Sequence, residues 1–260
     1  MLAYEDRVRG TRKAAETLTA LLDNVGLALG CLAAGVAVVP ALRAGSIAIG
    51  HGVLRPMLRR RLEAASRGSL VLTYDDGPSS SLQTRLLELL RARRAAATFY
   101  LLESRAEGQS AWIAELGRDG HEIATHSFGH LDAFRVAPRT AVADFRNGLA
   151  VVQSATRRVT RFRPPRGRVT VETYLAVRKA QLAFDLWTHD SGDTFTTCPS
   201  VDAIVRAVEA SGGGVVLLHS HDRGATRPDA EAHTLAVTSA LLDLAERRGL
   251  AVRRMCDLTA

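Results

Sequence analysis

The amino-acid sequence predicts an α/β fold built on a parallel sheet, which is either doubly wound or closed as a barrel. From Ser69 onward, short apolar runs alternate with amphipathic stretches of helical spacing. Strands that alternate with helices in this way pair in parallel, because each helix returns the chain to the same end of the sheet. The chain has 260 residues, enough for one large domain with a short appendage.

Each expected element rests on its own pattern. The short apolar runs are predicted strands, at Leu70–Tyr74, Ala96–Leu101, His121–Thr125, Arg161–Arg163, Ala183–Trp187, Val215–His219 and Ala251–Met255. The stretches between them repeat apolar residues at helical spacing and are predicted helices, at Leu82–Arg93, Trp112–Arg118, Ala141–Gln153, Val171–Lys179, Val201–Ala210 and Glu231–Arg248.

The N-terminal quarter differs from the rest in charge. Residues 1–67 hold ten Lys and Arg against five Asp and Glu, so they carry +5 of the total net charge of +7. A basic segment beside an apolar one suits an anionic membrane surface better than a nucleic-acid groove. The sequence also has no zinc-finger or RNA-binding signature. We therefore expect a helical extension over residues 1–67, a catalytic domain over residues 68–260, and no nucleic-acid partner.

Within this extension, Val25–Leu42 runs for 18 residues without a charge. As a helix it would extend about 27 Å, close to the thickness of a bilayer core. The alternative is an apolar helix packed on the domain, since Gly26, Gly30, Gly35 and Pro40 weaken a free helix. We expect a membrane-associated protein of the bacterial cell envelope, on a side of the membrane that the flanking arginines leave open.

Polar residues follow the predicted strands, and in a parallel barrel these strand ends share the face where active sites lie. The first cluster is T-Y-D-D-G-P, which contains Asp75 and Asp76. Adjacent carboxylates on a regular strand point to opposite faces, but both can reach one centre where the strand breaks. A bound cation would relieve the repulsion between them. The alternative is an ordinary Asp-Gly-Pro surface turn.

The second cluster, H-S-F-G-H, places His126 and His130 four residues apart. On one helical turn both imidazoles would face the same side, an arrangement that suits a divalent metal. The alternative is a pair of unrelated histidines. The glutamate of the H-E-x-x-H metalloproteases is missing here, so a peptidase is not predicted.

Three more clusters follow later strands. R-P-P-R-G at Arg163–Gly167 forms a stiff loop whose backbone N–H groups can be aimed. D-S-G-D at Asp190–Asp193 follows a strand that ends in Trp187. V-L-L-H at Val216–His219 is a buried strand that ends in a histidine. One such histidine is more often structural, but five clusters placed at successive strand ends predict an active site.

In this order, the five segments resemble carbohydrate esterase family 4, the NodB-homology polysaccharide deacetylases. The resemblance covers about residues 69–258 and includes G-H-E-I-A-T at Gly120–Thr125. It implies a distorted (β/α)7 barrel, here with an N-terminal helical, partly apolar extension, in agreement with the seven predicted strands. It also implies a metal-dependent hydrolase that removes N-acetyl groups from a carbohydrate.

The resemblance further implies roles for single residues. Asp76, His126 and His130 match the metal ligands, and the metal is usually Zn²⁺. Asp75 matches the general base and His219 the general acid.

The remaining matches are supporting groups. Arg163 matches the arginine that braces the base, and the backbone N–H of Arg166 matches the oxyanion donor. Asp190 matches the carboxylate that tunes the acid. Leu217 and Trp187 are expected in the wall of the substrate pocket. The sequence departs from the family at Arg166, which is usually aromatic, and at Thr194, which is usually Trp, so the pocket is expected to differ.

Three functions therefore compete. The first is an N-deacetylase acting on a cell-envelope polysaccharide, peptidoglycan or a lipid-linked amino sugar. The second is a related metal-dependent amidohydrolase acting on a non-carbohydrate amide. The third is a non-catalytic glycan-binding protein on the same fold.

Overall fold

The computed structural model describes residues 39–78, 82–156, 159–220 and 229–258. The chain divides into two compact units, residues 1–46 and 47–260, and the second contains every element discussed below. In the first unit, the described residues 39–46 are helical. Most of the predicted anchor, Val25–Leu42, lies outside the described residues. Across the described ranges, no helix combines the length and the apolar content that crossing a bilayer requires.

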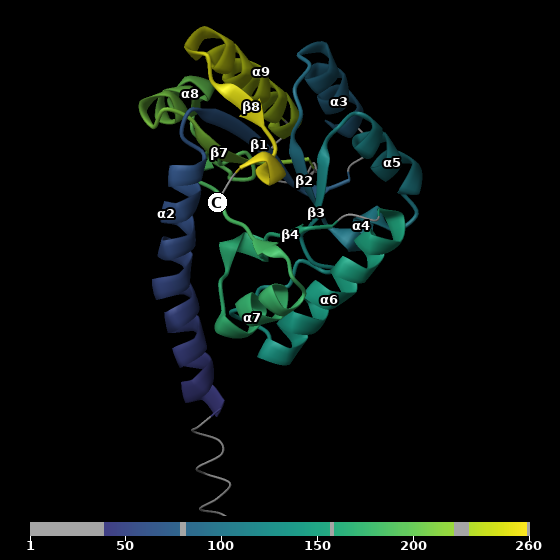
Figure 1. Ribbon diagram of the computed structural model, residues 1–260, viewed down its shortest axis with the longest axis vertical. Coiled ribbons are helices and arrows are strands. Elements are labelled where there is room, and N and C mark those ends of the chain that lie inside the picture. Colours follow the sequence, from purple (N-terminus) through teal and green to yellow (C-terminus); the bar gives the residue numbers. More distant parts are fainter. Residues whose placement is uncertain (1–38, 79–81, 157–158, 221–228, 259–260) are drawn as a thin grey trace, which may run out of the picture. The chain divides into compact units, whose positions relative to one another are not determined.

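The core of the second unit is a parallel sheet that curls into a half-barrel (Figure 1). Its strands are β1 (Ser69–Gly77), β2 (Thr98–Leu101), β3 (Glu122–Thr125), β4 (Arg161–Phe162), β5 (Ala183–Phe184), β6 (His189–Asp190), β7 (Gly214–His219) and β8 (Ala251–Arg253). The order is β5-β4-β3-β2-β1-β7-β6, and β8 pairs with the start of β1. This confirms the predicted α/β class and the distorted barrel. The two-residue β6 was not among the predicted strands.

Helices surround the sheet, and several begin and end where local chemistry requires. They are α2 (Arg55–Ala65), which follows the π-helical turn Gly50–Leu54, then α3 (Leu82–Ala92), α4 (Glu103–Ala106), α5 (Ser110–Arg118), α6 (Pro138–Ala155), α7 (Val171–Lys179), α8 (Val201–Ala210) and α9 (Ala230–Arg248). Thr170 and Ser200 cap α7 and α8 by accepting a backbone N–H from the first turn. A left-handed Gly249 ends α9.

The central strand β1 divides the core into two faces because successive side chains alternate. Leu70, Leu72 and Tyr74 face the outer helices and join the largest apolar cluster. Val71 joins a second cluster inside the curl of the sheet, together with Tyr100. Thr73 and Asp75 share the parity of Val71, so β1 delivers Asp75 to the interior of the half-barrel.

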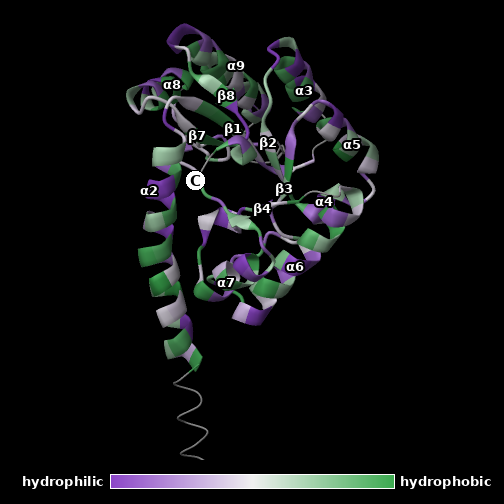
Figure 2. Ribbon diagram, viewed as in Figure 1, coloured by the Kyte–Doolittle hydropathy of each residue, from purple (hydrophilic) through white to green (hydrophobic). Residues whose placement is uncertain are grey.

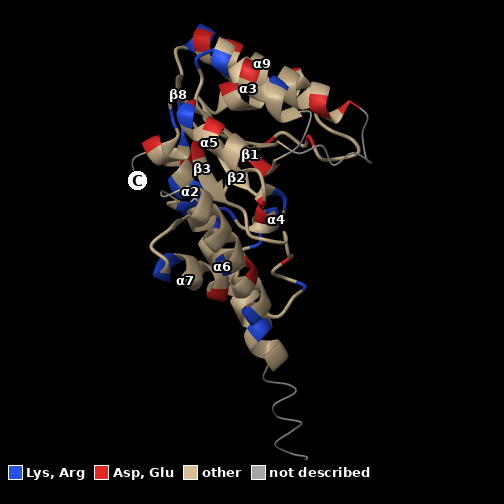
Figure 3. Cartoon of the chain, turned by 90° about the vertical axis from the view of Figure 1, so that its right-hand side faces the viewer, with Lys and Arg blue, Asp and Glu red and all other residues tan. Residues whose placement is uncertain are grey.

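The helices are amphipathic, which explains how they cover this sheet. Figure 2 shows hydrophobic and hydrophilic residues alternating along α3 and α6. On α3, Leu82, Leu86 and Leu90 recur every four residues and are buried. The outer faces carry charges of both signs, as Figure 3 shows along α9. The fold therefore buries apolar stripes against the sheet and leaves the strand ends to form the site.

Candidate active site

The end of β1 brings two adjacent carboxylates to one side. Asp76 has a left-handed backbone (φ 65°), and the pairing with β2 shifts register between Asp75 and Gly77. This irregularity breaks the strict alternation of the strand, so Asp75 and Asp76 can both face one centre. Both side chains are almost completely buried. The strand break that the sequence predicts at this position is therefore present.

The two histidines lie in a loop after β3, not on a helical turn as predicted. Residues 126–130 form no helix, and two of them, Ser127 and His130, have positive φ angles of 79° and 55°. These turns reverse the chain, so the His126 and His130 rings meet with their centroids 5.2 Å apart. The expectation of a shared helical face was wrong, because a loop brings the same two residues together.

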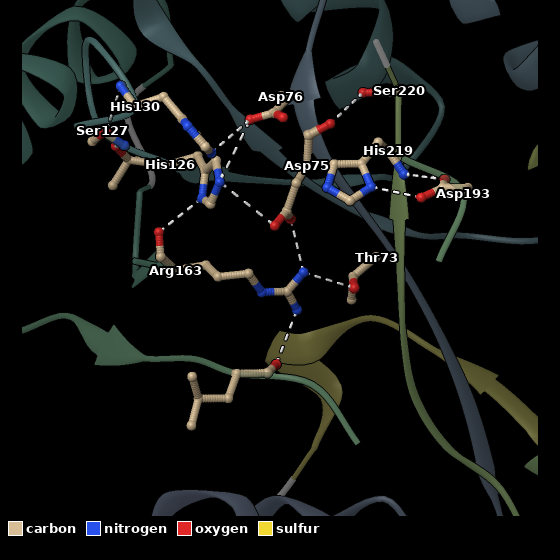
Figure 4. A network of polar contacts seen from close by, with 12 residues as sticks. Thr73, Asp75, Asp76, His126, Ser127, His130, Arg163, Asp193, His219 and Ser220 are labelled. Carbon is tan, nitrogen blue, oxygen red and sulfur yellow. Dashed lines mark hydrogen bonds and ion pairs between the residues drawn. The ribbon is translucent and has the colours of Figure 1, made fainter. Parts of the chain in front are cut away.

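Asp76, His126 and His130 form a group whose ligand atoms all lie within 4.8 Å of one another. Asp76 Oδ1 is 3.6 Å from His126 Nε2 and 3.5 Å from His130 Nε2 (Figure 4). Ligand atoms on a tetrahedral zinc, with bonds of about 2.1 Å, are separated by about 3.4 Å. One carboxylate and two imidazoles at these distances therefore fit a divalent metal.

The hydrogen bonding of His126 also favours metal binding. Its Nδ1 donates a hydrogen bond to the backbone carbonyl of Arg163 at 2.8 Å, which leaves the Nε2 lone pair directed at Asp76. Metal-binding histidines are commonly oriented by such a carbonyl.

Asp75 is held by a buried arginine. Arg163 Nη1 donates to Asp75 Oδ1 at 2.8 Å and to Thr73 Oγ1 at 2.9 Å, while Nη2 donates to the Leu186 carbonyl at 3.0 Å. The guanidinium also stacks over the Tyr100 ring, 4.0 Å from its centroid. Because Arg163 is fully buried, it compensates the charge that the neighbouring carboxylates bring into the core. The other Asp75 oxygen, Oδ2, lies 3.6 Å from His126 Nε2.

His219 ends β7, and the register of β1 with β7 pairs it with Asp75. Its Nδ1 donates to Asp193 Oδ1 at 2.7 Å, and its backbone N–H donates to Asp193 Oδ2 at 2.8 Å. Burial lowers the pKa of His219, but the charge and hydrogen bond of Asp193, together with the charges of Asp76 and Asp75, outweigh it and raise that pKa to about 9. These carboxylates therefore favour the protonated form of His219.

These groups surround a cavity of about 210 Å³. Its lining residues are Asp75, His126, His130, Arg166, Trp187, Asp190, Thr194, Phe195, Leu217 and His219. The cavity thus joins a buried carboxylate, a candidate metal centre and a histidine in one space, which is the arrangement that metal-assisted hydrolysis requires.

Comparisons with known proteins also point to a hydrolase. The polysaccharide deacetylase family profile matches residues 63–184. The chain is 31% identical to a chitooligosaccharide deacetylase of Rhizobium leguminosarum bv. phaseoli over 164 residues, which cover 61% of this chain and 71% of that protein. The chain belongs to carbohydrate esterase family 4. This membership makes it a metal-dependent hydrolase that removes N-acetyl groups from a carbohydrate.

Two further similarities support membership in the esterase family. A peptidoglycan-N-acetylglucosamine deacetylase of Bacillus cereus is 29% identical over 161 residues, which cover 60% of this chain and 76% of that protein. The solved structure of a family 4 carbohydrate esterase from Streptomyces lividans in complex with acetate superposes with a TM-score of 0.61. It is 26% identical, and the match covers 72% of this chain and 92% of that one.

In this family 4 esterase, one predicted contact has to be corrected. The resemblance assigns Asp190 the role of tuning the acid, but the hydrogen bonds to His219 come from Asp193. Asp190 lines the cavity, and its Oδ1 accepts the backbone N–H of Gly192 at 2.9 Å. Both carboxylates belong to the D-S-G-D motif, and the turn between them places Asp193 in hydrogen-bonding contact with His219. The motif alone therefore indicated the segment but not which carboxylate pairs with His219.

Three other predicted residues of the esterase, Arg166, Leu217 and Trp187, line the cavity. Arg166 lies in the short 3₁₀ turn Pro165–Gly167 with a left-handed backbone (φ 57°). A Cβ on Gly167 would lie 2.7 Å from Trp187 Cη2, so the turn and this side chain pack directly together. Leu217 and Trp187 both line the cavity, as expected of pocket walls. Phe195 also lines the cavity but was not predicted, because its only signal in the sequence is a large apolar side chain in a polar segment.

Proposed function

We propose that this esterase binds Zn²⁺ through Asp76, His126 and His130 and uses Asp75 as general base and His219 as general acid. The observation that carries the proposal is the register of β1 with β7, which pairs Asp75 with His219 beside the candidate metal ligands. A proton acceptor and a proton donor then stand at one scissile amide. We infer that the reaction releases acetate and leaves a free amino sugar.

Each group has a distinct task in this mechanism. A divalent ion, when bound, supplies Lewis acidity that polarises the acetamide carbonyl and acidifies water. Asp75, fixed through Oδ1 by Arg163, accepts the proton of the attacking water at Oδ2. The backbone N–H of Arg166 stabilises the developing oxyanion. His219, whose Nδ1 is held by Asp193, donates the Nε2 proton to the departing amine.

For the substrate, we propose an N-acetylated glycan of the cell envelope or a lipid-linked amino sugar. Relatives of this chain carry the names peptidoglycan and chitooligosaccharide deacetylase, which supports a glycan. The Arg166 guanidinium at the cavity would favour an anionic substituent such as a carboxylate or phosphate. We further propose that the basic residues 1–67 hold the enzyme near an anionic membrane.

The experiment is acetate release from three substrates: N-acetylglucosamine oligomers, peptidoglycan and polyprenyl-linked N-acetyl sugars. We expect release from at least one of them, its loss on chelation, and its return with added Zn²⁺. The Asp75→Asn variant should lose about 100- to 10,000-fold in kcat while it still binds Zn²⁺. Acetate release that chelation leaves unchanged would contradict the metal assignment, and full activity of Asp75→Asn would contradict the base. Formate release or opening of a cyclic imide would instead indicate a non-carbohydrate amide.

A further inference from the structure

The segment that carries the two histidines, residues 126–131, packs against α4 and α6. Figure 1 shows these two helices side by side next to β3. On the α4 side, the N–H groups of Glu103 and Ser104 donate to the carbonyls of Ser127 and Phe128 at 3.2 and 3.1 Å. These carbonyls therefore accept hydrogen bonds from N–H groups of the first turn of α4, which have no acceptor within the helix. The segment is fixed from this side through its carbonyls.

On the α6 side, one residue binds three backbone N–H groups of the segment. Asp144 Oδ1 accepts from Gly129 N–H at 2.7 Å, and Oδ2 accepts from Leu131 N–H at 3.3 Å. The Asp144 backbone carbonyl accepts from Phe128 N–H at 3.1 Å. The two carboxylate bonds therefore bracket His130 on both sides along the chain. Asp144 is only 8% exposed and takes no part in the chemistry proposed above.

His130 needs such support, because its backbone is left-handed, a conformation that residues other than glycine rarely adopt. A residue in such a conformation persists only where its surroundings enforce it. One helical turn after Asp144, Gly148 brings α6 against the same segment. A Cβ at Gly148 would lie 2.6 Å from the Ser127 carbonyl carbon and 2.8 Å from the Phe128 nitrogen. Glu103 Oε2 would also lie 2.8 Å from this Cβ, so the backbone of the segment and the Glu103 carboxylate together leave no space for a side chain.

We propose that Asp144 is a positioning residue for the metal ligand His130, and that Gly148 provides the close contact that this role requires. Asp144 acts through the backbone on either side of His130 and does not touch the metal or the substrate. Groups that orient metal ligands commonly contribute 10- to 100-fold to metal affinity. The inference rests on the proposed metal site and adds a specific residue that holds it.

The test is the Zn²⁺ affinity of purified full-length variants, measured by competition with a chromophoric chelator. Asp144→Asn keeps the shape of the side chain but turns an amide N–H₂ toward one of the two backbone N–H donors. Gly148→Ala favours the helix intrinsically but forces the segment away from it. We expect both variants to bind Zn²⁺ about 10- to 100-fold more weakly than the wild type. Asn147→Ala, at an exposed position of the same helix, is the control and should bind like the wild type.

Two further readouts separate positioning from general damage. The Co²⁺ absorption spectra of Asp144→Asn and Gly148→Ala should differ from that of the wild type, because the ligand geometry changes. The spectrum of the Asn147→Ala control should match the wild type. The metal-free Gly148→Ala variant should melt below the metal-free Asn147→Ala control, because the added Cβ meets backbone atoms, but it should still unfold in one cooperative transition well above the temperature of the titration. Zn²⁺ affinities of both variants within about twofold of the wild type would overturn the role of Asp144. A wild-type protein that binds no metal would instead overturn the proposed function itself, so the two failures are distinguishable.

Discussion

Asp193 binds His219 at two points, through the imidazole Nδ1 and through the backbone N–H of the same residue. A third donor, Thr234 Oγ1, binds Asp193 Oδ2 at 3.1 Å. The carboxylate therefore fixes both the position of the ring and its charge. Because Nδ1 is occupied, the proton available for the cavity is the one on Nε2. This relationship makes the activity of the acid depend on a residue outside the cavity lining.

The pH dependence follows from this pair. A general acid must be protonated, so kcat/KM should fall as the pH rises through about 9, the pKa of His219. Asp193→Asn removes the negative charge that raises this pKa while burial continues to lower it. The alkaline limb of the pH–rate profile should then move down by roughly 1–3 pH units. An alkaline limb that stays in place in Asp193→Asn would contradict the assignment of His219 as the acid.

The same shift predicts a pH dependence of stability. The pKa of His219 in the folded state, about 9, lies above its ordinary value of 6.5. The stabilisation from its protonation is therefore fully present below about pH 6.5 and is lost as the pH rises through about 9. Urea unfolding at a series of pH values should show this loss in the wild type and a smaller one in Asp193→Asn. Equal losses in the two proteins would contradict the pairing.

Removing Arg163 should destabilise the fold as well as the site. Arg163→Met leaves Asp75 buried without its cation, and breaking a buried pair in this way costs roughly 3–5 kcal/mol of unfolding free energy. The matched control is Arg91→Met, which removes exposed ion pairs with Glu115 and Asp119 and should cost much less, because solvent screens exposed charges. The free energies of unfolding of the two variants, measured by denaturant titration, are to be compared with that of the wild type. Similar losses would show that Arg163 does not compensate a buried charge.

Phe195 should affect substrate binding more than the chemistry. It lines the cavity while 55% of its surface stays exposed, as expected of an aromatic platform for a sugar ring. Phe195→Ala should raise KM for glycan oligomers roughly 2- to 10-fold, and Phe195→Trp should restore it. Leu175→Ala, at a similarly exposed apolar residue on α7, is the control and should leave KM unchanged. An unchanged KM in Phe195→Ala would show that Phe195 does not contribute to substrate binding.

Much of the fold could be predicted because its signals are local. The apolar runs around Leu72 and Val216 and the helical spacing of α3 and α9 are visible in the sequence. The strand β6 escaped prediction because it has only two residues, both polar, and exists through its pairing with β7. The four-residue α4 escaped for a related reason, since its first N–H groups are satisfied by the distant carbonyls of Ser127 and Phe128.

The site was predictable in its residues but less so in its contacts. Asp75, Asp76 and His219 stand at strand ends, where a motif identifies them. The spacing of His126 and His130 suggested a helix, but a left-handed His130 achieves the same approach in a loop. The pairing of His219 with Asp193 and not Asp190 depends on how a glycine-containing turn bends in three dimensions. A sequence motif does not record that bend.

In the proposed mechanism, Asp76, His126 and His130 hold a divalent ion on which acetate release depends. The most direct measurement titrates the chelator-treated, metal-free enzyme with Zn²⁺ and follows bound metal and acetate release together. We expect both to rise in parallel and level off at one ion per chain, and neither to rise when His126 and His130 are both replaced by alanine. Full acetate release before any metal is added, or an unchanged titration of the doubly substituted enzyme, would contradict it.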